Sequence, residues 1–230
     1  MESVENFYDN LSQEYTALIR KCVPRYGELL FNMFCYLPRD LRPQRILDLG
    51  CGTGNLTEQI RLHFPQAEIT AVDISGEILK ECQARFTGDP RMAYVQADFR
   101  DLPFGPGSFD LVMSSIAIHH IGDADKSTLY RRIHDLLNPG GVFVFADQTR
   151  GITDEIYAMH MDRWKEAAFQ LGSSQENWDM WMEHQQAHDH HTPVAWHLDE
   201  LRESGFPQVD VLWKNIMWLV AWARKQTASV

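Results

Sequence analysis

The chain has 230 residues, of which 44% are hydrophobic and 23% are charged, and its formal net charge is −11 at pH 7. This composition is ordinary for a folded globular protein, and the length fits one domain with an insertion or cap. The negative charge disfavours a nucleic-acid partner, and no apolar run reaches the roughly 18 residues of a membrane-spanning helix.

Residues 1–40 are predicted to form a helical N-terminal segment. Apolar residues recur at helical spacing within 7–19 and 29–37, and Pro24 should separate the two helices. The first ten residues lack both a basic start and an apolar stretch, so we expect no secretory signal and a cytoplasmic protein. The four cysteines show no CxxC spacing, so we expect reduced thiols.

Residues 41–150 are predicted to form an α/β core. Short apolar runs alternate there with amphipathic stretches. The expected strands are 45–49, 68–73, 92–96, 109–115 and 142–147, and the expected helices are 55–64, 76–86 and 124–137. This alternation predicts a parallel sheet with both faces covered by helices.

Residues 151–205 interrupt the alternation and are predicted to form a helical cap. The expected elements from here on are helices within 156–169, 178–182 and 198–204, and strands at 209–213 and 217–223. Because no crossover helix separates these two strands, we expect a β-hairpin within 206–225 that completes the core sheet.

A Gly-rich turn, Gly50-Cys51-Gly52-Thr53-Gly54, directly follows the first expected strand. Glycine lets the backbone approach a ligand closely, and ligands bind at the carboxyl ends of strands in open α/β sheets. Taken alone, the turn also fits a dinucleotide. Asp48 favours an amino-acid ammonium over a pyrophosphate, and the third glycine of the dinucleotide fingerprint is missing.

Two more carboxylates are expected to end the second and third strands. Asp73 could accept hydrogen bonds from both hydroxyls of a ribose. Asp98 could accept one from an adenine amino group, while Phe99 stacks on the ring. The alternative is that these acidic residues cap the helices that follow. Three carboxylates at successive strand ends favour a cofactor site.

These residues lie in segments that resemble the class I S-adenosylmethionine-dependent methyltransferases. The segments are ILDLGCGTGNLTEQI, AEITAVDIS, YVQADFRDLPF, FDLVMSSIAIHHI and LLNPGGVFVFAD, in that order over roughly 45–147. The resemblance implies a Rossmann-like sheet of seven strands, mostly parallel, with the last strand antiparallel. It also implies S-adenosylmethionine as the cofactor.

The resemblance assigns cofactor contacts residue by residue. These are Asp48, Gly50, Cys51, Gly52 and Gly54 for the methionine part, Asp73 and Ile74 for ribose and adenine, Asp98 and Phe99 for adenine, and Ser114 and Ser115 beside the sulfonium and the substrate. The segment FYDNLSQEYTALIRKCVPRYGELL resembles members whose N-terminal helix folds over the cofactor as a lid. Tyr15, Arg20 and Tyr26 are then candidate contacts, with helix packing as the alternative.

Two histidines, His119 and His120, follow the fourth expected strand at the rim where substrate should lie. One of them could act as a general base near neutral pH. The alternative, which we favour, is a pair that hydrogen-bonds the backbone around the cofactor. Methyl transfer is an in-line displacement, and positioning of the reactants can be sufficient for it.

The segment 183–197 holds five of the ten histidines: His184, His188, His190, His191 and His197. His184 and His188 are four residues apart, which places both rings on one helix face, and Asp189 or Glu183 could complete a metal site. The alternatives are substrate contact and simple solvent exposure. We predict substrate contact by His184, His188 and His191 and assign no metal.

The leading functional prediction is a methyltransferase that acts on an O, N or S nucleophile of a small molecule. The sequence RKCVPRY resembles enzymes that use carboxy-S-adenosylmethionine to modify the wobble uridine of tRNA. That alternative would be favoured by a positive patch comprising Arg20, Lys21, Arg25, Arg39, Arg42 and Arg45. A non-catalytic cofactor-binding module is a third possibility, which the intact glycines and carboxylates oppose. The sequence is also compatible with a homodimer.

Overall fold

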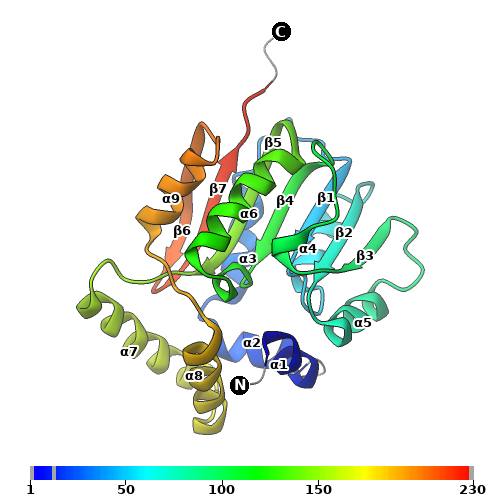
Figure 1. Ribbon diagram of the computed structural model, residues 1–230. Coiled ribbons are helices and arrows are strands. Elements are labelled where there is room, and N and C mark those ends of the chain that lie inside the picture. The colour runs from blue at the N-terminus through cyan, green and yellow to red at the C-terminus, as the bar shows by residue number, and fades with distance from the viewer. Residues whose placement is uncertain (1–2, 12–13, 228–230) are drawn as a thin grey trace.

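The computed structural model describes residues 3–11 and 14–227. A seven-stranded sheet in the order β3-β2-β1-β4-β5-β7-β6 forms its centre (Figure 1). The strands are β1 (Arg45–Leu49), β2 (Glu68–Asp73), β3 (Met92–Gln96), β4 (Phe109–Ser115), β5 (Leu137–Gln148), β6 (Gln208–Asn215) and β7 (Trp218–Arg224). β1 to β5 are parallel, and β7 is antiparallel to both β5 and β6. The predicted fold class is therefore confirmed.

Strand β5 begins earlier than the sequence predicts. Its turn-like residues 138–141 interrupt the pairing with β4, but Leu137 already pairs with Phe109 before that irregularity. Pairing resumes at Val142, which is the predicted start. The Pro-Gly-Gly sequence thus produces a bulge within the strand and does not fully separate helix from strand.

Successive side chains of a strand point to opposite faces, so the apolar strands present apolar side chains on both faces of the sheet. Helices cover both faces. Ile46 of β1 packs in the cluster that contains residues of α3 (Tyr26–Cys35) and α4 (Asn55–His63). Leu47 and Leu49 pack in a second cluster with residues of α6 (Asp123–Leu136) and α9 (Val194–Glu203). α5 (Gly76–Arg85) packs beside β2 and β3. Both clusters are buried, as expected for a largely parallel sheet.

The N-terminal segment contains three helices among its described residues, whereas two were predicted. α1 (Val4–Leu11) and α2 (Tyr15–Cys22) precede α3, and residues 12 and 13 lie outside the described part. α1 contacts α5, where the Asp9 carboxylate accepts hydrogen bonds from the Ser75 hydroxyl and, at 3.3 Å, from the Glu77 backbone N–H. This contact fixes α1 against α5.

Two cap helices, α7 (Asp154–Gln170) and α8 (Gln175–His188), lie beside α2 at the carboxyl edge of the sheet (Figure 1). Trp164 Nε1 of α7 donates a hydrogen bond to the carbonyl of Cys22 at 2.7 Å, which ties the cap to α2. The predicted cap also included 198–204, but this segment lies in α9, which packs on α6 and β6. Burial of Leu201 with Phe206 in the core holds α9 there.

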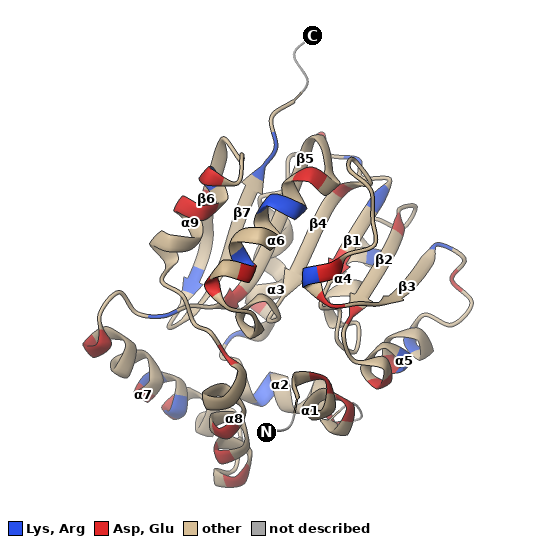
Figure 2. Cartoon of the chain, in the orientation of Figure 1, with Lys and Arg blue, Asp and Glu red and all other residues tan. Residues whose placement is uncertain are grey.

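No helix in the described ranges 3–11 and 14–227 is long and apolar enough to cross a membrane. Acidic and basic residues are spread over most of the helices (Figure 2).

Candidate functional site

A cavity of about 670 Å³, its mouth included, lies where the parallel strands end. The turn after β1, the ends of β2 and β4, the segment after β3 and the helices α1 and α2 contribute its walls. Eight residues predicted from the sequence line it: Tyr15, Gly50, Gly52, Asp73, Ile74, Asp98, Phe99 and His120. The structure therefore brings together residues that are up to 105 positions apart, since 120 − 15 = 105.

The Gly-rich turn is fixed against β2. The backbone N–H groups of Gly50 and Cys51 donate to the Val72 carbonyl at 2.8 and 2.9 Å, and the N–H of Gly52 donates to Asp73 Oδ2 at 2.8 Å. Gly50 has a φ of +71°, and a Cβ atom there would lie 2.4 Å from Cβ of Ala117. Only glycine therefore fits between this turn and the loop after β4.

Asp73 ends β2 as predicted, and its carboxylate is largely buried. Besides Gly52, the backbone N–H of Ser75 donates to it, at 3.0 Å to Oδ1. Burial raises the pKa of Asp73, although these two N–H groups act in the opposite direction. Because a carboxylate offers roughly four lone-pair directions, Asp73 keeps the capacity to accept a further hydrogen bond from a ligand in the cavity.

Asp98 lies two residues beyond the end of β3, and does not end the strand as expected. It caps the short helix η1 (Phe99–Asp101), where Oδ1 accepts hydrogen bonds from the backbone N–H and from Nε of Arg100, both at 2.9 Å. The Arg100 guanidinium lowers the pKa of Asp98, so this carboxylate is anionic at neutral pH. Phe99 and Ile78 supply apolar wall beside it.

The helices α1 and α2 close the cavity from the side opposite the Gly-rich turn. The Tyr15 ring lies 3.6 Å from the position that a Cβ atom on Gly52 would take. The Tyr8 hydroxyl is 2.9 Å from Nε2 of His120, and this hydrogen bond joins α1 to the segment after β4. Both tyrosines line the cavity.

Asp48 was expected at the cofactor and does not line the cavity. It is fully buried, and its Oδ2 accepts a hydrogen bond of 2.5 Å from the Thr57 hydroxyl of α4. Successive strand residues point to opposite faces, so Asp48 shares the face of Ile46 and points under α4. Its other oxygen, Oδ1, has no partner among the described residues.

The remaining predicted cofactor residues also lie outside the cavity lining: Arg20, Cys51, Gly54, Ser114 and Ser115. Cys51 and Gly54 face α5, since a Cβ atom on Gly54 would lie 2.9 Å from Sγ of Cys82. The Ser114 hydroxyl donates to the Leu49 carbonyl at 2.7 Å and so joins β4 to β1. Arg20 lines a separate hollow together with Tyr26.

The buried Asp48 predicts a pH-dependent stability. Burial raises the pKa of Asp48 to about 7, whereas an unfolded Asp titrates near about 3.9. Between these pH values the folded state holds a proton that the unfolded state has released, so the contribution of Asp48 to stability falls as the pH rises from about 4 to about 7. The free energy of unfolding of Asp48→Asn, compared with that of the wild type, should therefore be about 1–3 kcal/mol higher at pH 8 than at pH 5.

Urea unfolding at both pH values measures this difference. Asp199→Asn is the matched control, because the Asp199 side chain is 70% exposed. Equal pH slopes for Asp48→Asn and the wild type would show that Asp48 is ionised in the folded protein.

A second, smaller cavity of about 350 Å³ adjoins the first, and Tyr8 and Ile116 line both. Its aromatic wall comes from Trp164, Trp181 and Trp218, on α7, α8 and β7 respectively. Its polar side chains are those of His119, Gln148, His184 and Asp189. Two residues predicted to meet the substrate or perform catalysis, His119 and His184, thus share this cavity.

His119 and His120 lie in the short helix η2 (Ile118–His120) after β4. Nδ1 of His119 is 2.5 Å from Oδ1 of Asp147, and its backbone N–H donates to Oδ2 at 2.9 Å. Burial alone lowers the pKa of His119, but the carboxylates of Asp147 and Asp189 outweigh it and raise the pKa. Burial, reinforced by His119, lowers the pKa of His120. The two side chains thus contact carboxylates and Tyr8, where backbone contacts were favoured from the sequence.

The histidines of 183–197 separate into different environments. His184 is buried and stacks on Phe7 with ring centroids 3.9 Å apart, and burial lowers its pKa to about 3. His188 lies 5.0 Å from His184, ring centre to ring centre, and is half-buried, while His190 is exposed. His191 Nδ1 is 2.7 Å from the Tyr157 hydroxyl. His197 lies in α9, where its Nδ1 is 2.7 Å from the Tyr130 hydroxyl, and it lines neither cavity.

Sequence reasoning missed Tyr8, Ile116, Asp147 and Gln148 as residues of this region. Tyr8 lies on α1 and Tyr15 on α2, so helical spacing does not relate them. Asp147 is a further carboxylate near a strand end, in β5, like those already considered. Nothing in the local sequence distinguishes Ile116 or Gln148, which reach the site through the packing of β4 and β5.

Comparisons with known proteins bear on the whole arrangement. Residues 46–141 match the sequence profile of a family described as "Methyltransferase domain". Malonyl-[acyl-carrier protein] O-methyltransferase of Legionella pneumophila is 31% identical over 127 residues, which cover 55% of this chain and 43% of that protein. Carboxy-S-adenosyl-L-methionine synthase of Shewanella baltica is 30% identical over 157 residues, which cover 65% of this chain and 64% of that protein. These matches span less than two thirds of either relative.

Solved structures share the fold. Phosphoethanolamine N-methyltransferase 2 of Haemonchus contortus, in complex with S-adenosyl-L-methionine, superposes with a TM-score of 0.71 at 19% identity and covers 99% of this chain and 61% of that one. Human N-acetylserotonin methyltransferase, also in complex with S-adenosylmethionine, gives a TM-score of 0.62 at 21% identity, with 96% and 56% of the two chains covered. At these identities the likeness concerns the fold alone.

Proposed function

Because the chain belongs to the class I S-adenosylmethionine-dependent methyltransferase family, we propose that it methylates an O, N or S nucleophile of a small molecule. One observation carries the choice of a small molecule: the adjoining cavity is narrow, with a tryptophan-rich wall and few polar side chains. Apolar walls with a few polar groups are typical of sites for small organic ligands.

The larger cavity fits S-adenosylmethionine. Gly50, Gly52 and Tyr15 all line it, and Asp73 retains acceptor capacity for a ribose hydroxyl. Phe99 and Ile78 offer apolar surface to an adenine. We therefore assign the methionine part to the Gly-rich turn and the adenosine part to the ends of β2 and β3.

The acceptor would lie in the second cavity, on the far side of Tyr8 and Ile116. S-adenosylmethionine, when bound, supplies an electrophilic methyl group on a sulfonium. The tryptophans exclude water from the second cavity, and Gln148 Oε1, which has no hydrogen-bond partner among the described residues, is available to orient the nucleophile. Tyr8 and His120 hold the lid closed across the junction of the two cavities.

Loss of the Asp73 carboxylate should weaken S-adenosylmethionine binding by about 1–3 kcal/mol, because a ribose hydroxyl would lose a charged acceptor. Asp73→Ala tests this by isothermal titration calorimetry with S-adenosylmethionine and with S-adenosylhomocysteine. Asp73→Asn should show a smaller loss, since the amide oxygen still accepts one hydrogen bond. NAD should give no heat with the wild type.

The control is Asp199→Ala on α9, which removes an exposed carboxylate far from the cavity and should bind normally. Normal binding by both Asp73 variants would overturn the assignment of the ribose. Binding of NAD in place of S-adenosylmethionine would overturn the proposed function itself.

A second candidate is the synthesis or use of carboxy-S-adenosylmethionine. It is supported by the relatives named as carboxy-S-adenosyl-L-methionine synthases, which are 27–30% identical over 65–68% of this chain. Calorimetric titration with the carboxy derivative separates the two candidates. Tighter binding of that derivative than of S-adenosylmethionine would favour the second.

The tRNA substrate considered for that candidate is opposed by the charge distribution. The side chain of Arg25, one of the residues of the expected patch, is paired with Glu28 at 2.6 Å, and the net charge of the chain is −11. Both observations weaken the attraction of this surface for a phosphate backbone.

A further inference from the structure

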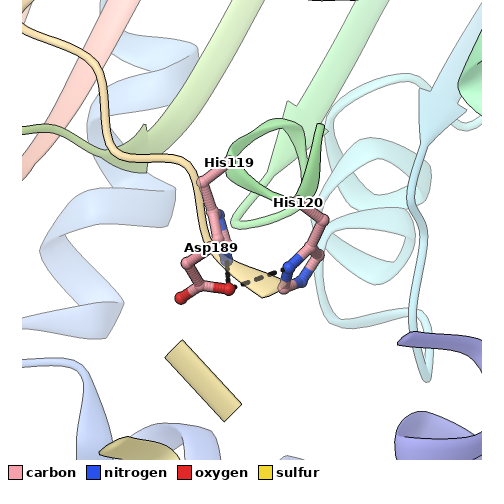
Figure 3. Close-up of side chains that lie close together, drawn as sticks. All are labelled: His119, His120 and Asp189. Carbon is pink, nitrogen blue, oxygen red and sulfur yellow. Dashed lines mark hydrogen bonds and ion pairs between the residues drawn. The ribbon is translucent and has the colours of Figure 1, made fainter. Parts of the chain in front are cut away.

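The carboxylate of Asp189 is surrounded by four imidazole rings. Its Oδ1 lies 3.0 Å from Nδ1 of His120, 3.7 Å from Nε2 of His119 and 3.8 Å from Nε2 of His184. Its Oδ2 lies 3.6 Å from Nε2 of His191. Figure 3 shows His119 and His120 with their rings directed toward Asp189. The segment after β4 and the segment after α8 thus converge on one buried point.

In three of these rings, the nitrogen that points away from Asp189 contacts an oxygen atom. Nδ1 of His119 contacts Asp147, Nε2 of His120 contacts the Tyr8 hydroxyl, and Nδ1 of His191 contacts the Tyr157 hydroxyl. In each ring the second nitrogen faces Asp189. A histidine that binds a metal characteristically has its other nitrogen fixed by a carboxylate, hydroxyl or carbonyl in this way.

Nitrogen atoms at the centre of the cluster lack partners. Neither nitrogen of His184, and not Nε2 of His191, has a hydrogen-bond partner within the part of the chain that the structure describes. Both side chains are only 3–4% exposed. If the rings served only to solvate the Asp189 charge, their nitrogens would be expected to donate to it. Buried polar atoms without a partner call for one, such as a bound ion.

We propose that this cluster binds one divalent transition-metal ion of the Zn²⁺ type. The ligands would be Asp189 Oδ1, His119 Nε2 and His120 Nδ1. His184 Nε2, 3.8 Å from Asp189 Oδ1, would have to shift toward the other two histidines to become the fourth. Three of these residues, His119, His120 and Asp189, offer ligand atoms that all lie within 4.8 Å of one another. Two ligands bound tetrahedrally at about 2.1 Å from zinc are about 3.4 Å apart, and the contacts of Asp189 Oδ1 bracket this value.

The donor set selects the kind of ion. Imidazole nitrogens suit Zn²⁺ and its first-row neighbours, whereas Mg²⁺ and Ca²⁺ require mainly oxygen ligands. The site also has space beside it, because His119, His184 and Asp189 line the smaller cavity. No metal was assigned from the sequence, and this proposal replaces that prediction. The metal site considered from the sequence used His184 with His188, whereas the ligands proposed here come from two separate segments and do not include His188.

Titration with metal alone tests the site. Untagged protein is stripped with a chelator, and Zn²⁺ binding is followed by calorimetry and Co²⁺ binding by visible absorption. We expect one ion per chain and the d–d bands of tetrahedral Co²⁺. Asp189→Asn, which changes a proposed ligand, should weaken Zn²⁺ binding at least tenfold. Asp147→Asn, which changes the partner of His119 Nδ1, should weaken it by about 10–100-fold. His184→Gln provides a second ligand variant should Asp189→Asn fail to fold.

The matched control is His190→Ala. His190 is exposed and adjacent to Asp189 in sequence, so its loss should leave the affinity for Zn²⁺ unchanged. Absence of stoichiometric binding by the folded wild type would overturn the proposal. So would binding that Asp189→Asn and His184→Gln leave unaltered. S-adenosylmethionine titrated into the metal-stripped protein is a separate measurement, so a failure of the metal site is distinguishable from a failure of the proposed function.

Discussion

We expect the Gly50→Ala variant to lose S-adenosylmethionine binding and to be less stable than the wild type. A Cβ atom at this position would lie 2.4 Å from Cβ of Ala117 and 3.0 Å from Cζ of Phe99. The turn must therefore move away from the loop after β4, into the cavity that it lines. Overpacking of this kind costs about 1–3 kcal/mol, and the left-handed φ of +71° costs an alanine roughly another 1–2 kcal/mol.

The control for backbone strain is Gly88→Ala. Gly88 has a φ of +84°, but a Cβ atom there would meet nothing within 4 Å. This variant should lose only about 1–2 kcal/mol of stability, from the left-handed conformation alone, and should bind S-adenosylmethionine normally. Unfolding in urea and calorimetric titration measure the two quantities for both variants. Wild-type affinity in folded Gly50→Ala would mean that the ligand does not contact this turn.

The sheet could be predicted in detail because its physical signals are local. β1 to β4 coincide with the predicted ranges. β1, β2 and β4 are short apolar runs that are mostly buried, and β3, at the edge of the sheet, is only partly buried. Gly50 was recognisable from the Gly-rich pattern, and the structure explains this glycine by the close approach of Ala117 together with its left-handed φ. β5 differed because its pairing with β4 begins at Leu137, and pairing with another strand cannot be read from the turn-like sequence 138–141 itself.

The position of Asp48 shows where the motif was misleading. Asp48 is next to the Gly-rich turn in the sequence, and this position suggested a contact with the cofactor. In the structure, the alternation of side chains along β1 directs Asp48 toward Thr57 of α4. The same alternation, applied to Ile46 and Asp48 together, would have predicted this from the sequence.

The histidine cluster could not be assembled from the sequence for a different reason. A spacing of four identifies His184 and His188 as neighbours on a helix. Asp189 contacts His119 and His120, although about 70 residues separate them in the sequence (189 − 119 = 70). These contacts depend on how α8 packs against the end of the sheet. No periodicity or local motif encodes that distance.

The second large effect is expected in the cap, where Trp164→Ala should destabilise the protein by about 3–5 kcal/mol. The ring is 2% exposed and packs edge-on against Trp178 at 5.0 Å and Trp218 at 5.2 Å, so it joins α7 to α8 and to the sheet. Its Nε1 also donates the hydrogen bond to Cys22 that joins α7 to α2. Trp164→Phe keeps most of the packing and should lose about 1–3 kcal/mol, because the Cys22 carbonyl loses its donor.

Urea unfolding monitored by circular dichroism measures these losses, with Phe169→Ala as the control on the same helix. Phe169 is 39% exposed, so its truncation should cost much less than that of Trp164. Because Trp164 also lines the smaller cavity, the wall against which we place the acceptor depends on the same contacts that stabilise the cap. If Trp164→Ala lost no more stability than Phe169→Ala, the cap would not be anchored to the core through this residue. The proposed acceptor cavity would then lack a fixed wall on the side of α7.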